Sequence, residues 1–166
     1  MVRLYALLAV AYEINNQAAI GRLLRVDGLK EAAFRWACKN GHADVVRPLL
    51  ALDGPFGVDP NAGDAWAFRM ACKHGRGEVV RLLLELEGDR QVPEQAQVEQ
   101  AFHLACEHGH EEVVRILLAL EGELRVDVHA EGNAAFNCAC SGGHTAVVLV
   151  LLALEGDRRI NVNGNG

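Results

Sequence analysis

Cysteine and histidine are the side chains of this chain best suited to chemistry. Five cysteines and seven histidines occur among its 166 residues, and thiolates and imidazoles are the usual ligands of zinc. Four of the cysteines follow one another at a spacing of 34 residues: Cys38, Cys72, Cys106 and Cys140. A constant spacing of this length is typical of a repeat array, in which a recurring residue belongs to the scaffold. These cysteines are therefore predicted to be packing residues.

Neither a disulfide nor a metal site is expected from the cysteines. Helices stacked in an array lie about 8–10 Å apart, beyond the ~7 Å limit between the Cα atoms of a disulfide. The fifth cysteine, Cys138, is two residues from Cys140, so the two thiols do not share one face of a helix. No metal or cofactor is predicted.

The histidines follow the repeat as well. Three of them recur at one position, which holds arginine in the remaining full repeat: His42, His110, His144 and Arg76. This exchange leaves the pattern intact and favours a structural role for the position. Outside the repeat frame the sequence shows no nucleophile–base pair, no glycine-rich phosphate loop and no pair of carboxylates.

The period divides the chain into one repeat domain. Residues 30–63, 64–97, 98–131 and 132–166 form four full repeats, and residues 1–29 form a degenerate N-terminal repeat with a shorter connector. A repeat array buries apolar surface only between neighbouring repeats, and about three repeats suffice for stability. The 166 residues are enough for a stable single domain.

Composition excludes two classes of partner. The formal net charge is −6, whereas nucleic-acid binding requires a basic surface for the phosphates. No apolar run approaches the ~18 residues of a membrane span. The first eleven residues resemble a very short signal peptide, but they are shorter than the usual ~15 residues and coincide with the first helix of a repeat. Unpaired cysteines in helices favour an intracellular location, cytoplasmic or nuclear.

Each repeat is predicted to hold two helices. In the third repeat, apolar residues at helical spacing indicate a helix over about residues 98–107, which Gly109 ends, and a second helix after His110. Glu111 stands four residues before Arg115, a spacing that suits an ion pair on the outer face.

Two further residues carry predictions about the second helices. Gly122 follows the second helix of the third repeat and is expected to cap it in a left-handed conformation. Pro48 lies inside the second helix of the first full repeat, where an interior proline costs about 3 kcal/mol unless the helix bends. A local kink is predicted there.

With these elements the sequence resembles the ankyrin repeat family. The similarity lies in Leu-Ala-x-x-x-Gly-His at residues 104–110, Glu-Val-Val-Arg-x-Leu-Leu at residues 112–118, and the Val-Asp-x-x-Ala and Asn-Val-Asn segments after the second helices. The family's Thr-Pro-Leu-His opening is absent, and the period is one residue longer than the usual length of about 33. The resemblance implies an all-α fold, an α-solenoid of stacked helix–turn–helix repeats with short β-hairpin or extended finger loops.

The resemblance also implies a protein-binding scaffold and not an enzyme. His103, Glu107 and His108 come closest to a catalytic group. In an ankyrin array, however, the inner face is open to water, which is a poor setting for the shifted pKa values that catalysis requires.

Residues that vary between repeats on the inner, concave face are the candidates for binding. Arg35, Lys39, Arg69 and Lys73 form a basic patch over two repeats, since a spacing of four places each pair on one helix face. Trp66 replaces the Ala or Gln of the other repeats and is either an interface anchor or a cover for the neighbouring finger. The predicted partner-binding residues are Arg35, Lys39, Trp66, Arg69, Lys73, His74, His103, Glu107, His108 and Asn137.

The sequence therefore predicts a non-catalytic protein-interaction scaffold, whose partner is a protein or peptide with an acidic segment. The alternative is a structural spacer or oligomerisation segment, a fragment of a longer ankyrin array in a multidomain protein. The last repeat lacks the polar capping helix that terminal repeats need for solubility. Self-association through this C-terminal end is expected.

Overall fold

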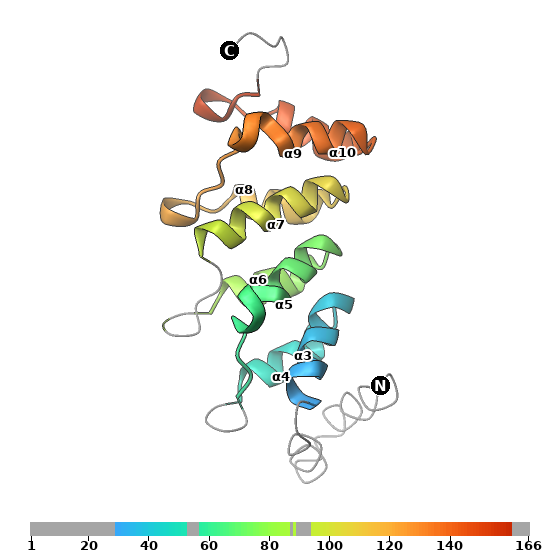
Figure 1. Ribbon diagram of the computed structural model, residues 1–166, viewed down its shortest axis with the longest axis vertical. Helices are drawn as coiled ribbons and strands as arrows, with labels where there is room; N and C mark the ends of the chain where they lie inside the picture. Colours follow the sequence, from blue (N-terminus) through green and yellow to red (C-terminus); the bar gives the residue numbers. More distant parts are fainter. Residues whose placement is uncertain (1–28, 53–56, 87, 89–93, 161–166) are drawn as a thin grey trace.

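The paired helices stack in one column along the long axis of the molecule (Figure 1). The computed structural model describes residues 29–52, 57–86, 88 and 94–160. The degenerate repeat at residues 1–29 lies outside this part of the chain, apart from Leu29. The helix pairs are α3 (Leu29–Asn40) with α4 (Ala43–Leu50), α5 (Ala62–Lys73) with α6 (Gly77–Leu84), α7 (Gln95–Glu107) with α8 (Glu111–Leu118), and α9 (Ala130–Ser141) with α10 (Thr145–Leu152).

Each first helix packs against the first helices of the neighbouring repeats and against the second helix of its own repeat. The second helices α4, α6, α8 and α10 form a parallel row behind them (Figure 1). The described residues contain helices and turns but no β-strand. The predicted α-solenoid of helix–turn–helix repeats is confirmed.

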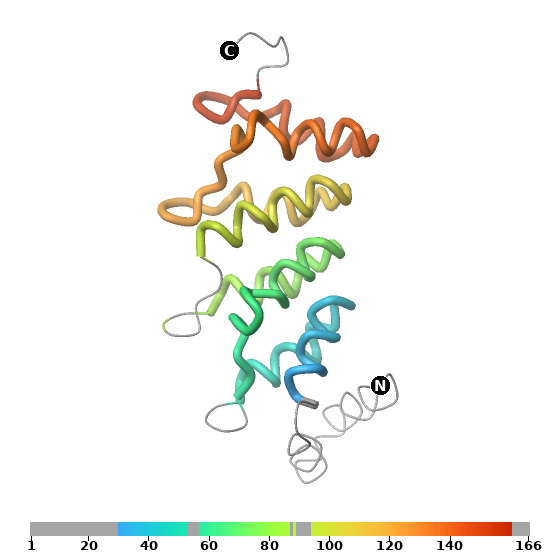
Figure 2. Tube along the Cα trace, in the orientation of Figure 1, coloured from blue at the N-terminus to red at the C-terminus, as the bar shows by residue number. Residues whose placement is uncertain are grey.

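The described parts of the finger segments leave the column on one side, between one repeat and the next (Figure 2). In the third and fourth repeats each finger begins with a short 3-10 turn, η3 (Gly122–Leu124) and η4 (Gly156–Arg158), and continues in extended backbone. Among the described residues the fingers thus take the extended form and not the hairpin form.

The prediction for Gly122 is wrong. The α8 helix ends at Leu118, and its C-cap Ala119 keeps a right-handed conformation. Gly122 does have a positive φ of 65°, but it uses this freedom to begin the 3-10 turn. The helix needs no glycine there because the chain continues in a right-handed turn, and Ala119 N–H donates to Arg115 and Ile116 O.

The glycine after each first helix has the capping role instead. Gly109 has a φ of 74°, which costs glycine little because it has no Cβ. Its N–H donates to Cys106 O, and the next residue, His110, donates to Ala105 O. These two bonds form a Schellman motif, which satisfies carbonyls that the helix end leaves free. The predicted end at Gly109 and restart after His110 are both confirmed.

Small and branched apolar residues fill the layers between repeats. Phe68 is fully buried, and Phe34 and Phe102 are 2% exposed. Cys38, Cys72 and Cys106 are buried as free thiols, as their packing role requires. The exception is Cys140, which is exposed. The packing role predicted for it is wrong in this structure because the layer that buries the other three thiols comes from the following repeat.

Two of the first helices begin in an unusual way. Three successive residues ahead of α5 proper, Gly63 to Ala65, have φ values of 70°, 59° and 49°. The equivalent residues ahead of α9, Glu131 to Asn133, have φ values of 50°, 68° and 65°. A left-handed conformation costs a non-glycine residue about 1–2 kcal/mol. In contrast, α7 begins regularly three residues earlier than predicted, with a capping box in which Gln97 Oε1 accepts from Glu94 N–H.

Pro48 does not end its helix. The α4 helix continues for two residues beyond it, and Ala51 N–H still donates to Arg47 O. Helical backbone thus runs through the position at which the sequence predicts a kink.

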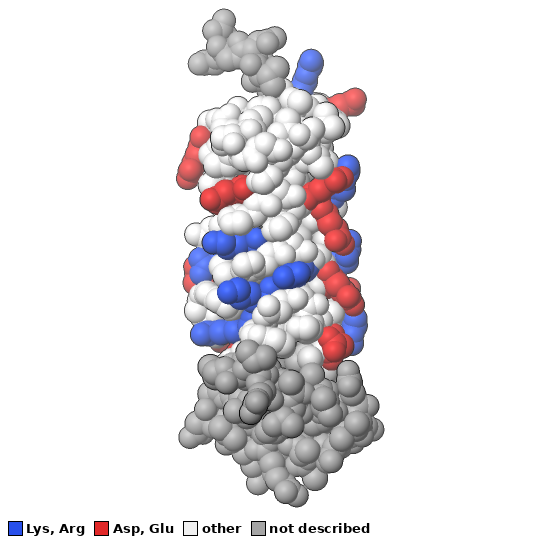
Figure 3. Space-filling model, turned by 90° about the vertical axis from the view of Figure 1, so that its right-hand side faces the viewer, with Lys and Arg blue, Asp and Glu red and all other residues white. Residues whose placement is uncertain are grey.

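On the outer side, charged residues of the second helices form ion pairs. Arg115 pairs with Glu111 of its own helix at 2.9 Å, as the sequence predicts. Arg81 pairs at 2.8 Å with Glu112 of the following repeat. Figure 3 shows these surfaces as a column of alternating acidic and basic side chains along one edge. Exposed pairs of this kind contribute about 0–1 kcal/mol each, so they add little to stability.

Candidate functional site

Basic side chains gather near the ends of the first two described first helices. Figure 3 shows Lys and Arg side chains across the middle of the face that carries the turns, with acidic side chains above them. Lys39 at the end of α3 is exposed, and Lys73, His74 and Arg76 around the end of α5 are half-buried. These four residues are called the basic cluster below.

The electrostatics of His74 show how close these charges lie. Partial burial lowers the pKa of His74 below its ordinary value of 6.5, and the positive charges of Lys39, Arg76 and Lys73 lower it further. His74 is therefore neutral at pH 7, and the charge of the cluster comes from its Lys and Arg side chains. An anion bound here would favour protonation of His74, because it offsets the same repulsion.

Arg76 belongs to the basic cluster although the sequence analysis assigned it only a structural position. Its Nε donates to Lys39 O of the preceding repeat at 3.1 Å. His110 Nε2 lies 2.8 Å from Lys73 O, and His144 Nε2 lies 2.8 Å from Glu107 O, also across repeat boundaries. The structural role predicted for this position is confirmed, and we call these three contacts the staples.

The glycine that ends each of α3, α5 and α7 makes room for a staple. A Cβ on Gly75 would lie 2.5 Å from His110 Nδ1, and a Cβ on Gly41 would lie 2.8 Å from Arg76 Cδ. The turn glycine is thus required twice, by its positive φ and by the close approach of the next repeat's side chain.

Trp66 is half-buried and lies beside Arg35 of the preceding repeat. The Arg35 guanidinium carbon is 5.8 Å from the centre of the indole ring, within the range of a cation–π contact. The indole holds Arg35 in place next to the basic cluster, and both side chains keep a surface that faces solvent.

Among the predicted site residues, Arg69 is the one most engaged in contacts within the chain. Its side chain is 19% exposed and lies 3.4 Å from Asp64 Oδ2. Nη1 donates to Gln100 Oε1 at 2.5 Å, and Nη2 donates to Gly63 O at 3.3 Å. The side chain therefore ties the left-handed turn before α5 to the next repeat, and its charge is already paired.

The remaining predicted residues lie on the third and fourth repeats. His103 Nε2 is 3.3 Å from Cys138 Sγ of the next first helix, a contact that the sequence analysis did not foresee. His108 Nδ1 is 3.0 Å from Leu104 O, next to the exposed carboxylate of Glu107. Asn137 Nδ2 donates to Gly132 O at 3.4 Å. Positive charge therefore does not continue into this half of the face.

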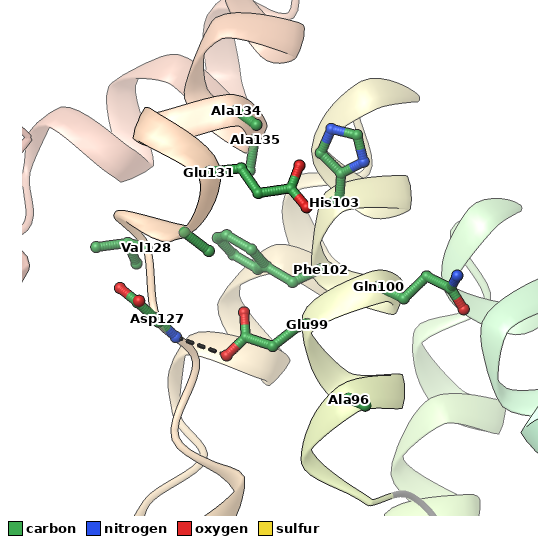
Figure 4. A pocket seen from close by; sticks show the side chains of 11 residues that line it. Ala96, Glu99, Gln100, Phe102, His103, Asp127, Val128, Glu131, Ala134 and Ala135 are labelled. Carbon is green, nitrogen blue, oxygen red and sulfur yellow. Dashed lines mark hydrogen bonds between the residues drawn. The ribbon is translucent and has the colours of Figure 1, made fainter.

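A pocket of about 330 Å³ opens between α7 and α9, beside the finger that joins them. Phe102 and Val128 contribute apolar walls, and Glu99, Gln100 and Glu131 contribute polar groups (Figure 4). The sequence pattern does not reveal this pocket, because its lining includes finger residues and Glu131, whose left-handed conformation helical spacing does not predict.

The described residues hold no group of three or more His, Cys, Asp or Glu side chains that could bind a metal ion. Within the same part of the chain, no helix is both long and apolar enough to cross a membrane.

A comparison with known protein families finds a repeat family that agrees with the helix pairs and their spacing. The family described as ankyrin repeats (3 copies) matches residues 70–164, more than half of the chain. The chain belongs to the ankyrin repeat family. A search of curated proteins found no match to the chain. Ankyrin repeats are in general protein–protein interaction modules and are typically non-catalytic, so the coarse functional prediction agrees with the family.

Proposed function

We propose that this ankyrin array is a non-catalytic scaffold that binds an acidic segment of a partner protein on its concave face, at the basic cluster together with Arg35 and Trp66. The observation that supports it best is the gathering of Lys39, Lys73 and Arg76 around His74. Burial is the first cause of the lowered pKa of His74, and the positive charges of these three side chains lower it further. Carboxylates of a partner would offset these charges.

The surface around the cluster fits such a partner. The chain carries a net charge of −6, so the basic cluster is a local excess of positive charge on a protein that is acidic as a whole. Arg35 is held against the indole of Trp66, which reduces the rotamer entropy lost when a partner carboxylate binds. Trp66 adds aromatic surface of the kind found at interface hot spots.

Charge reversal tests the proposal. The probe is a fluorescein-labelled hexaglutamate peptide, titrated in fluorescence anisotropy at several salt concentrations. Replacing Lys39→Glu and Lys73→Glu together should weaken binding at least about tenfold, because two charge-assisted contacts become repulsive, and should reduce the salt dependence of binding.

The matched control is the double variant Arg47→Glu and Arg81→Glu, which makes the same change in net charge on exposed outer-face residues. It should retain most of the affinity. If both double variants weaken binding equally, only the net charge matters and the site assignment fails.

A second candidate, the structural spacer or oligomerisation segment, has its own observation. The α10 helix is apolar along nearly its whole length, and Leu149 and Leu152 are 60% and 43% exposed. Leu149 stands where other repeats have Arg47, Arg81 and Arg115 on the outer face. For this candidate, the molar mass in light scattering should rise with protein concentration for the wild type and stay monomeric for Leu149→Arg. A constant monomeric mass for the wild type excludes an oligomerisation segment.

A further inference from the structure

The pocket between α7 and α9 combines an apolar interior with carboxylates at its rim. Phe102 and Val128 are 2% and 3% exposed and form fixed walls. Glu99 and Glu131 bring two carboxylates to the lining, whereas Asp127 Oδ1 accepts from His129 N–H of its own finger. At about 330 Å³ the pocket is near the lower end of the range of ligand sites, which suits one long side chain better than a whole cofactor.

Hydrogen bonds already occupy some of the polar groups of the lining. Glu99 Oε1 accepts from Asp127 N–H at 2.9 Å and from Gln95 Nε2 at 2.8 Å. Gln100 Oε1 accepts from Arg69 Nη1. These bonds hold the α7 wall and the finger in place, so the pocket is preformed.

Glu131 is different. Its carboxylate points across the pocket toward His103 (Figure 4), and within the described part of the chain it has no hydrogen bond or ion pair. Glu131 is exposed and lines the pocket, and its backbone has a φ of 50°. Gly63 stands at the equivalent position ahead of α5, so the turn itself does not require a glutamate.

We propose that this pocket binds the cationic side chain, Lys or Arg, of the segment whose acidic residues bind the basic cluster. The methylene stem would lie against Phe102 and Val128, since long basic side chains cover apolar surface while their charged head remains polar. The head would meet the Glu131 carboxylate in a charge-assisted hydrogen bond. This inference rests on the proposed function, and it also specifies the direction in which the bound segment runs along the array.

Charge complementarity excludes the other occupants. An acidic side chain would face the carboxylates of Glu99 and Glu131, and an apolar one would cover the Glu131 carboxylate without giving it a partner, which is costly. Arg69 donates a hydrogen bond to Gln100 of the lining, but its charge is already paired with Asp64. Of the ring nitrogens of His103, Nε2 contacts Cys138 Sγ. No described cation therefore neutralises Glu131.

The test uses the full chain, labelled with 15N, and titrates it with acetyl-arginine amide in two-dimensional NMR. Acetyl-norleucine amide is the control probe, because it keeps the apolar stem and lacks the charge. The arginine probe should shift the amides of Phe102, Val128 and Glu131, and the norleucine probe should bind more weakly. Glu131→Gln should weaken the arginine probe about tenfold, the loss of one charge-assisted hydrogen bond.

The hexaglutamate peptide separates the two proposals. Glu131→Gln should leave hexaglutamate affinity unchanged, and the Lys39→Glu and Lys73→Glu double variant should leave the arginine probe unaffected. If hexaglutamate binds but the arginine probe does not, or if Glu131→Gln leaves the arginine probe unaffected, the pocket assignment is overturned and the proposed function stands. If hexaglutamate fails to bind, the proposed function is overturned. Circular dichroism melting confirms that each variant is folded.

Discussion

Cys106 in the third repeat and Cys140 in the fourth occupy the same position of the sequence pattern, but their surroundings differ. Cys106 is fully buried, and Cys140 is exposed. Leu118 is 8% exposed, and the equivalent Leu152 is 43% exposed. The difference shows that in this array a core residue is buried largely by the following repeat, so the same side chain stabilises one repeat and contributes little to another.

The phenylalanines provide the strongest test of this difference. Phe102 is buried between α5 and α9, whereas Phe136 of the fourth repeat is half-buried. Phe102→Ala should lower the free energy of unfolding by about 3–5 kcal/mol, as in other large-to-small core changes. Phe136→Ala should lower it by about half as much, because less apolar area is lost. Urea unfolding followed by circular dichroism measures both, and equal losses would contradict the end effect.

Substitution of the cysteines should change the free energy of unfolding less than substitution of the phenylalanines, and alkylation of the thiols provides an independent check. Cys106→Ser should cost about 1–3 kcal/mol, since a buried hydroxyl would replace a thiol that packs as an apolar group. Cys140→Ser should stay within about 0.5 kcal/mol, as at other surface positions. Burial raises the pKa of the Cys106 thiol to about 12, so iodoacetamide at pH 8 should alkylate Cys140 and leave Cys106 unmodified. Alkylation of both in the folded protein would refute the assignment.

The two repeats also differ in how their first helices begin, and here the expected effects have opposite signs. Gln97 and Glu131 stand at equivalent positions. Gln97→Gly should lower stability by about 1–2 kcal/mol, because it removes half of a capping box and places glycine in a helix. Glu131→Gly should raise stability by about 1 kcal/mol, because glycine adopts the left-handed conformation without strain.

The same Glu131→Gly variant should lose the arginine probe. A gain in stability together with a loss of binding would show that the strain is retained for a functional reason. Thermal unfolding of the two glycine variants measures the effect, and changes of the same sign would show that both helices begin alike in solution.

The smallest effect concerns pH. Burial is the main cause of the lowered pKa of His110, the staple between the second and third repeats. The unfolded chain, with an ordinary pKa near 6.5, therefore takes up its proton first as the pH falls, and stability decreases from about pH 6.5 downward to the folded pKa.

Because Arg76 makes the equivalent contact with a permanent charge, His110→Arg should reduce this loss of stability. His74 contributes in the same direction as His110. His129 contributes in the opposite direction, since hydrogen bonds to Asn133 and Asp157 O raise its pKa. The comparison is therefore between the wild type and His110→Arg in urea unfolding at pH 7 and pH 5. An unchanged difference between the two pH values would contradict the role of His110.

The sequence predicted those features that depend on one repeat and its period. The break at Gly109, the restart after His110, the structural use of the turn histidines and the Glu111–Arg115 pair all follow from local spacing. The left-handed starts at Gly63 and Glu131 did not follow, because they depend on how a finger returns to the next helix.

Contacts between repeats were equally hidden from the sequence analysis. Arg69 with Gln100 and Arg81 with Glu112 join residues 31 apart, a separation that no helical or strand period suggests. For the candidate site, the basic residues were found from their spacing, whereas the paired state of Arg69 and the pocket beside Glu131 required the three-dimensional structure.

The staples also form in a fixed order during synthesis of the chain. Each one runs from the residue after a turn glycine back to a carbonyl 37 residues earlier in the chain. During synthesis from the N-terminus, the contact at Lys73 O can form only after His110 has left the ribosome. Each repeat of the nascent protein is therefore fastened to its predecessor in turn, and a pause in translation before a turn would leave the preceding boundary open.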